Sequence, residues 1–171
     1  SSVSRLAFVH AKVITLHQAA QIAELHRLKN QKIVFTNGCF DLLHLGHITY
    51  LAEAASLGDK LFVAVNDDAS VRALEKGENR PVNPEFARAM VLAALGMVDH
   101  VIVFSENTPL NTILAIKPDL IVKGGDYDAD LTDPSDKRYI VGKNEAKAWG
   151  GQAQTILLVD GYSTTGLLAK R

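Results

Sequence analysis

The sequence has little of what disulfide-bonded, metal-thiolate or membrane-spanning proteins need. It contains one cysteine, Cys39, which excludes an internal disulfide and any zinc site built from several cysteines. No apolar run reaches the ~18 residues that a membrane helix needs. The longest candidate, around 87–98, is interrupted by Arg88 and Gly96. No signal peptide is recognisable, so we expect a cytoplasmic protein without a membrane partner.

Two common glycine-rich nucleotide fingerprints are also missing. No glycines are spaced Gly-x-Gly, and there is no Walker A lysine motif. A net charge of −1 gives no electrostatic basis for a nucleic-acid partner. The acidic run from Asp126 is not an EF-hand, because Leu131 and Lys137 stand where that loop needs glycine and glutamate. We interpret 127–137 as a loop at the rim of a site.

The composition is that of a globular protein. With 171 residues, 47% of them hydrophobic and 22% charged, the chain is long enough to bury a core. We predict one domain over 1–171, with 1–30 as an N-terminal helical segment packed on it.

Short apolar strands alternate with helical segments along the chain. Strands are expected at Ile33–Thr36, Leu61–Val65, Val101–Phe104, Leu120–Val122 and Thr155–Val159. Helices are expected after a capping box of Thr15 and Gln18, at 44–57 and 69–74, from Asn83 as N-cap with Pro84 first in the helix, from Thr108 to Ile116, at 137–149, and after Ser163. The alternation predicts an α/β fold, a Rossmann-like doubly wound parallel five-stranded sheet with helices on both faces.

Polar residues follow four of these strands. They are Asn37-Gly38 with Asp41, Asn66-Asp67, Lys123-Gly124-Gly125-Asp126, and Gly161-Tyr162-Ser163-Thr164-Thr165. Ligands of such sheets bind at the carboxyl ends of strands, where the strand order reverses. The pattern therefore predicts one ligand-binding rim.

The strongest functional signal is the stretch Ile33–His47. A strand ends at Asn37-Gly38, and His44-Leu45-Gly46-His47 then opens a helix. Amides at a helix N-terminus bind phosphate, and imidazole donors add to the field of the helix dipole. A histidine alone is more often a half-buried polar residue than a catalyst, and no Glu or Cys completes a zinc set. The combination favours a phosphate site.

These residues also carry a resemblance. Gly38-Cys39-Phe40-Asp41 followed by His44-Leu45-Gly46-His47 resembles the signature of the cytidylyltransferase-like nucleotidyltransferases. The resemblance continues through Lys76-Gly77, Arg80-Pro81-Val82-Asn83, Arg88, 122–127 and 161–165. In that order, the set most resembles the adenylyltransferases that make ADP-heptose from D-glycero-β-D-manno-heptose 1-phosphate and ATP, for lipopolysaccharide or surface-polysaccharide synthesis. It covers roughly Lys12 to the C-terminus.

The resemblance implies direct attack of a sugar 1-phosphate on the α-phosphorus of ATP, with Mg²⁺ shielding the triphosphate. It assigns catalysis to His44, His47 and Lys76. It assigns nucleotide binding to the two histidines and to Thr36, Asn37, Gly38, Phe40, Lys123, Gly124, Asp126, Ser163, Thr164 and Thr165. Asp41, Asn66, Arg80, Arg88 and Lys12 would bind the substrate phosphate or sugar.

One departure from the family concerns Ser163-Thr164-Thr165. Several relatives carry an arginine a few residues earlier, where this chain has Val159-Asp160. Lys12 or Arg88 is the candidate to replace that charge. The serine also fits a plain helix cap.

Two alternatives stay open. One is a cytidylyltransferase acting on glycerol 3-phosphate or a similar small phosphate, and the other is a non-catalytic nucleotide-binding module. Members of the family commonly dimerise, which leaves a homodimer or higher homo-oligomer open.

Overall fold

In the computed structural model, which describes residues 4–74 and 79–158, the centre of the fold is one parallel sheet. Its strands are β1 (Ile33–Gly38), β2 (Lys60–Asn66), β3 (His100–Phe104), β4 (Leu120–Gly124) and β5 (Gln152–Ile156), in the order β3-β2-β1-β4-β5. All four neighbouring pairs are parallel. The order reverses between β1 and β4, so the predicted rim lies where such sheets bind ligands.

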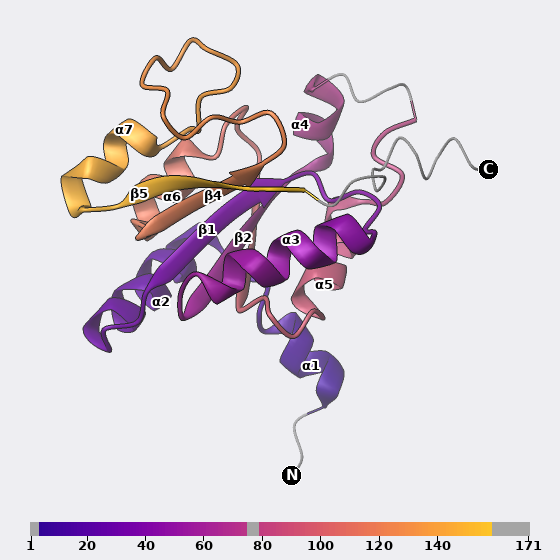
Figure 1. The fold of residues 1–171 in the computed structure, drawn as a ribbon. Coiled ribbons are helices and arrows are strands. Elements are labelled where there is room, and N and C mark those ends of the chain that lie inside the picture. Colours follow the sequence, from indigo (N-terminus) through magenta and orange to yellow (C-terminus); the bar gives the residue numbers. More distant parts are fainter. Residues whose placement is uncertain (1–3, 75–78, 159–171) are drawn as a thin grey trace.

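Helices cover both faces of the sheet (Figure 1), as predicted. On one face, α3 (Leu45–Ser56) and α5 (Glu85–Ala93) bury a core that includes Leu51 and Leu92. On the other, α2 (Leu16–Leu28) and α6 (Leu110–Ile116) bury Ala23 and Ile113 with Phe35 and Phe62 of the strands. The remaining helices are α1 (Arg5–His10), α4 (Asp68–Ala73), α7 (Lys143–Ala146) and the 3₁₀ turn η1 (Lys147–Trp149).

Consecutive residues of β1 point to opposite sides, as strand geometry requires. Val34 packs with α3 and α5, while Ile33 and Phe35 pack with α2 and α6. The central strand is therefore buried from Ile33 to Thr36 and becomes partly exposed only at Asn37.

Local signals predicted the start of α2 correctly. The Thr15 hydroxyl accepts a hydrogen bond from the backbone of Gln18, and the Gln18 side chain accepts one from the backbone of Thr15. This reciprocal cap satisfies two helix donors within four residues, so it needs no tertiary partner.

Other boundaries differ from the predictions. Pro84, not Asn83, is the N-cap of α5, and Pro109, not Thr108, is the N-cap of α6. The predicted helix over 137–149 is confined to 143–149, because Gly142 adopts φ 93°, a left-handed conformation that ends any helix from upstream. Strand β5 lies at 152–156, three residues before its predicted start, and α1 lies within the helical segment predicted over 1–30, although no helix start was predicted there.

Of the helices that the structure describes, none combines the length and the apolarity that crossing a membrane takes.

Candidate active site

The carboxyl ends of three neighbouring strands meet at one rim, as the sequence pattern predicted. Asn66 ends β2, and Asn37 and Lys123 are the last residues but one of β1 and β4. The Lys123 ammonium donates to the Asn37 carbonyl at 2.9 Å and lies 4.9 Å from the centre of the Tyr127 ring. The rim is therefore held together by a cation from β4 that reaches the end of β1.

The loop from β1 to α3 is shaped by glycine and by a left-handed residue. Phe40 has φ 48°, and a Cβ on Gly38 would lie 3.0 Å from the Phe40 ring. The Phe40 ring in turn meets the His47 ring edge-on, with 5.8 Å between centroids. Gly38 thus leaves room for an aromatic support beneath His47.

His44 and His47 form a reciprocal cap at the start of α3. Nδ1 of His44 accepts from the backbone N–H of Gly46 at 3.1 Å, and Nδ1 of His47 accepts from the backbone N–H of His44 at 3.3 Å. The two ring centroids are 3.9 Å apart. Because both Nδ1 atoms accept, each neutral ring carries its proton on Nε2.

The electrostatics keep both rings neutral near pH 7. Burial lowers the pKa of His47 to about 4, and the neighbouring His44 lowers it further in the same direction. Burial also lowers the pKa of His44. The pair therefore presents neutral N–H donors at a helix N-terminus, where the peptide dipoles already favour an anion.

Asp41 holds the segment before α5. Its side chain has 0% exposure and accepts from Arg80 Nε at 2.6 Å and from the backbone N–H groups of Val82 and Asn83 at 2.7 and 2.8 Å. Burial alone would raise the pKa of Asp41, but these backbone donors and Arg80 together lower it. All its contacts in the described structure are internal. The predicted substrate contacts of Asp41 and Arg80 stay predictions, while their mutual ion pair is a structural tie.

Arg88 does not lie on the exposed rim where a substrate contact was expected. It is 1% exposed and donates four hydrogen bonds, to Asn83, Cys39, Asn66 and Asp68. It therefore sits beneath the rim, because three carbonyls and a carboxylate satisfy the buried guanidinium there.

Lys12 does not lie at the rim either. Its backbone carbonyl pairs with Val101 at the beginning of β3, and its ammonium donates to the carbonyls of Leu95 and Val98. This is the amino end of the sheet, opposite to the rim where a substrate contact of Lys12 was expected.

Thr36 and Gly124 make internal contacts, while their predicted nucleotide contacts stay predictions. The buried Thr36 hydroxyl bonds to the Tyr50 hydroxyl at 2.7 Å and donates to the Val122 carbonyl at 2.9 Å. A Cβ on Gly124 would lie 2.7 Å from Leu158 and 3.2 Å from the Tyr50 ring. The side chain of Thr36 thus ties β1 to β4 and α3, and Gly124 gives room to neighbouring side chains.

A cavity of about 390 Å³ opens beside the rim. It is lined by Asn37, Asn66, Leu74, Phe104, 107–109, Lys123, Tyr127, 134–137 and 139–141. The rim loop predicted over 127–137 therefore forms a wall of it. Sequence reasoning missed Tyr127 and 107–109, although 107–109 follow β3 as the other polar groups follow their strands.

No group of three or more His, Cys, Asp or Glu side chains among the described residues is arranged to hold a metal ion. Asp126 is exposed at the rim, and the Asp41 carboxylate is occupied by donors. Mg²⁺ commonly reaches such sites on substrate phosphates, with only one or two protein carboxylates. The described residues thus fit a cation that enters with its nucleotide. Lys76, Ser163, Thr164 and Thr165 lie outside the described residues.

Comparison with known proteins agrees with this geometry. The cytidylyltransferase-like family model matches residues 35–165. The chain belongs to the cytidylyltransferase-like family. Among curated relatives, the bifunctional protein HldE of Geobacter metallireducens is 47% identical over 94% of this chain, and that of Pseudomonas fluorescens Pf0-1 is 49% identical over 92%. In both, the match covers 31% of the relative, so this cytidylyltransferase-like chain spans about a third of their length.

Solved structures show the same fold. The lipopolysaccharide core biosynthesis protein from Thermoplasma volcanium is 30% identical, with a TM-score of 0.59 over 78% of this chain and 99% of that one. The pantoate-β-alanine ligase of Francisella tularensis is 14% identical, with a TM-score of 0.55 over 92% of this chain and 76% of that one, and shares the fold alone.

Proposed function

We propose that this cytidylyltransferase-like chain is an adenylyltransferase that joins ATP and D-glycero-β-D-manno-heptose 1-phosphate into ADP-heptose and pyrophosphate. The observation that carries the transferase chemistry is the His44–His47 cap. Its Nδ1 atoms both accept, which leaves neutral Nε2–H donors at a helix N-terminus. Such donors suit a triphosphate whose α-phosphorus becomes more crowded and more charged in the transition state.

In the proposed reaction, an oxygen of the sugar phosphate attacks the α-phosphorus of ATP. A new P–O bond forms, the bond between the α-phosphorus and the bridging oxygen breaks, and that oxygen leaves with its electron pair in pyrophosphate. No proton has to be removed from the attacking phosphate oxygen, so positioning and charge neutralisation carry the catalysis. Bound Mg²⁺ would supply charge neutralisation on the triphosphate.

The acceptor is assigned to the cavity beside the rim. At about 390 Å³ the cavity has the size of a small-molecule site. Lys123 provides a cation for a phosphate, and Asn37, Asn66 and Asn107 provide amides that can bond sugar hydroxyls. The neighbouring Tyr127 and Phe104 give the cavity apolar walls.

The sugar assignment is supported by the motif set at 38–47, 80–83 and 122–127. It is also supported by similarity to a protein named for lipopolysaccharide core biosynthesis and to the HldE proteins. A second candidate is a cytidylyltransferase for glycerol 3-phosphate, because the matching family model is described by that nucleotide.

The test is a pyrophosphate-release assay of the purified chain. ATP and CTP are each combined with heptose 1-phosphate, glucose 1-phosphate and glycerol 3-phosphate, with Mg²⁺ or with excess EDTA. We expect release only with ATP, heptose 1-phosphate and Mg²⁺ together. Turnover with CTP and glycerol 3-phosphate instead would select the second candidate. Nucleotide binding without turnover in any combination would indicate a binding module.

A further inference from the structure

We propose that Arg88 is a positioning residue, which fixes the β1–α3 loop so that His44 and His47 stay aligned on the α-phosphorus. The inference rests on the proposed function for its kinetic consequence. Arg88 itself is buried, and the transfer chemistry does not use it.

The contacts of Arg88 join three separate segments. Its Nη1 donates at 2.7 Å both to the Cys39 carbonyl, in the β1–α3 loop, and to the Asn66 carbonyl, at the end of β2. Its Nε donates at 2.9 Å to the Asn83 carbonyl before α5. A single nitrogen thus bridges the ends of two adjacent strands, while the same planar group holds a third segment.

Of the four groups that Arg88 bonds, one carries a negative charge. Nη2 lies 2.8 Å from Oδ1 of Asp68, at the start of α4, whose side chain is 28% exposed. The other acceptors are neutral carbonyls. Desolvating a guanidinium is costly, and apolar residues of similar volume commonly replace buried ion pairs without loss of stability. Stability alone therefore gives a weak reason for an arginine here, whereas holding three carbonyls around one planar group gives a specific one.

Asp41 closes the same loop from its other side. Its carboxylate receives Val82 and Asn83 backbone donors, and its carbonyl accepts from Asn83 Nδ2 at 2.8 Å. Cys39 and Asp41 flank Phe40, which supports the His47 ring. The loop is thus fixed at two residues immediately before the His44 cap.

This arrangement predicts which kinetic constant responds. Arg88 touches neither nucleotide nor acceptor in the assigned geometry, so its loss leaves ground-state binding largely in place. A shift of the histidines by about 1 Å is enough to cost on the order of 10²-fold in rate. The loss should appear in kcat rather than in KM, since the histidine donors matter most in the transition state.

The test compares Arg88→Lys and Arg88→Ala with Arg27→Lys. Arg27 is a matched control, because it also bonds a backbone carbonyl, that of Ile116, and a carboxylate, that of Glu24, but joins α2 to α6. Lysine cannot reproduce the planar fork. We expect Arg88→Lys to lower kcat by about 10- to 100-fold with KM for ATP changed less than about threefold. Arg27→Lys should leave kcat unchanged.

Two further readouts separate positioning from folding. Millimolar guanidinium should restore at least part of the kcat of Arg88→Ala, because it can occupy the vacated cavity. Imidazole ¹⁵N NMR should show that Arg88→Lys alters the His44 and His47 resonances while His17, exposed on α2, is unchanged.

Wild-type kcat in folded Arg88→Lys, or histidine resonances that match those of the wild type, would overturn the proposal. If the wild-type chain turns over no nucleotide and acceptor at all, the proposed function fails, and the NMR comparison still decides whether Arg88 positions the histidine loop.

Discussion

The backbone N–H of His44 donates to Nδ1 of His47 at 3.3 Å, so the second histidine of the pair caps the helix that begins after the first. In the proposed mechanism, the side chain that caps the helix is thereby also a catalytic donor. Substituting either histidine removes both a cap, worth about 1 kcal/mol, and an Nε2–H donor at the start of α3.

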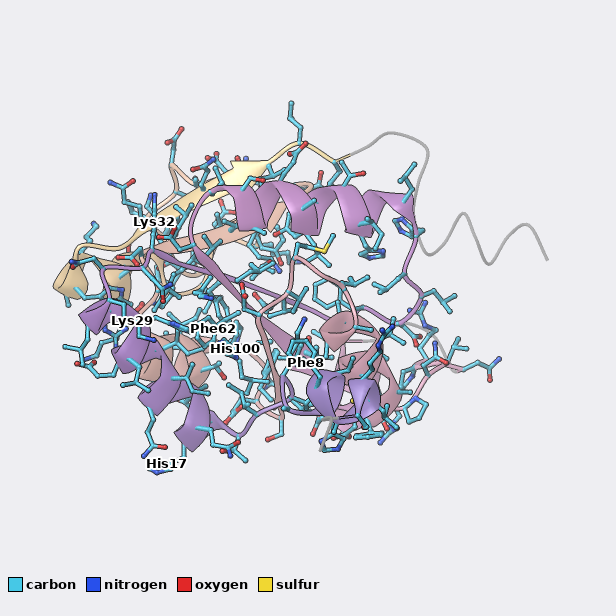
Figure 2. All side chains as sticks on the ribbon, turned by 90° about the horizontal axis from the view of Figure 1, so that it is seen from below. Phe8, His17, Lys29, Lys32, Phe62 and His100 are labelled. Atoms are coloured by element: carbon cyan, nitrogen blue, oxygen red, sulfur yellow. The ribbon has the colours of Figure 1, made fainter. Side chains whose placement is uncertain are left out.

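Replacing His47 by alanine is expected to lower kcat by at least about 10²-fold, comparable to the loss of one oxyanion donor. Steady-state pyrophosphate release with ATP and heptose 1-phosphate measures it. His17→Ala is the control, because His17 is exposed near the start of α2, away from the body (Figure 2). Near-wild-type turnover in His47→Ala would remove His47 from the mechanism.

Stability is expected to fall on acidification from about pH 6.5 to about pH 4. Burial lowers the pKa of His100 to about 4, helped by His26, and burial likewise lowers that of His47 to about 4. In this window the unfolded chain binds more protons than the folded one, so protons favour unfolding. Above about pH 6.5 these groups add no pH dependence.

Urea unfolding as a function of pH measures this effect. The Nε2 atoms of His26 and His100 are 3.0 Å apart, and His100 lies beside Phe62 (Figure 2). His100→Gln should flatten the slope between pH 6.5 and 4, whereas His17→Gln should keep it. An unchanged slope in His100→Gln would show that His100 is not a source of the acid sensitivity.

Thr36→Val is expected to destabilise the fold by about 1 kcal/mol, the net worth of a typical hydrogen bond, without raising KM for ATP. The hydroxyl is buried between Tyr50 and the Val122 carbonyl. Denaturant midpoints and initial rates measure the two quantities. Tyr50→Phe removes the partner from the other side, and the double variant should show coupling. A several-fold rise in KM for Thr36→Val would instead support the nucleotide contact predicted from sequence.

Asp41→Asn is expected to cost about 3 kcal/mol, because it leaves buried donors facing an amide group. Asp126→Asn is the matched change on an exposed rim carboxylate and should alter stability by less than about 0.5 kcal/mol. If Asp126 binds the nucleotide as predicted, its variant raises KM for ATP. Urea midpoints and ATP saturation curves distinguish the two residues, and equal stability of both variants would contradict the role of Asp41.

Features set by neighbours in the sequence were predictable, and those set by distant contacts were not. The Thr15 cap and the apolar strands depend on residues a few positions apart. Asn83 looks like an N-cap, but its side-chain amide donates to the Asp41 carbonyl, 42 residues away. The spacing of residues in the sequence does not reveal such a distant partner.

The candidate site divides in the same way. The strand-end pattern predicted that Asn37, Asn66 and Lys123 share a rim, because parallel strands end together. It could not tell a rim arginine from a buried one, so Arg88 was assigned to the substrate. Lys12 was misplaced because nothing local shows that its neighbour Val13 bridges to Val101 at the amino end of β3. The single domain over 1–171 and the homo-oligomer stay predictions.

The position of β1 between β2 and β4 has a consequence for how the protein folds. The backbone N–H of Ile33 donates to the Asp119 carboxylate, 86 residues later, and Val34 pairs with Leu120. The strand that leads to the histidines therefore keeps one unpaired edge until a distant segment arrives. Pairing of strands that are far apart in the sequence slows folding. Until the pair forms, the apolar edge of β1 is exposed and can associate with other chains. We expect the histidine rim to be among the last parts of the molecule to become native, after the β1–β2 pair and its covering helix have formed.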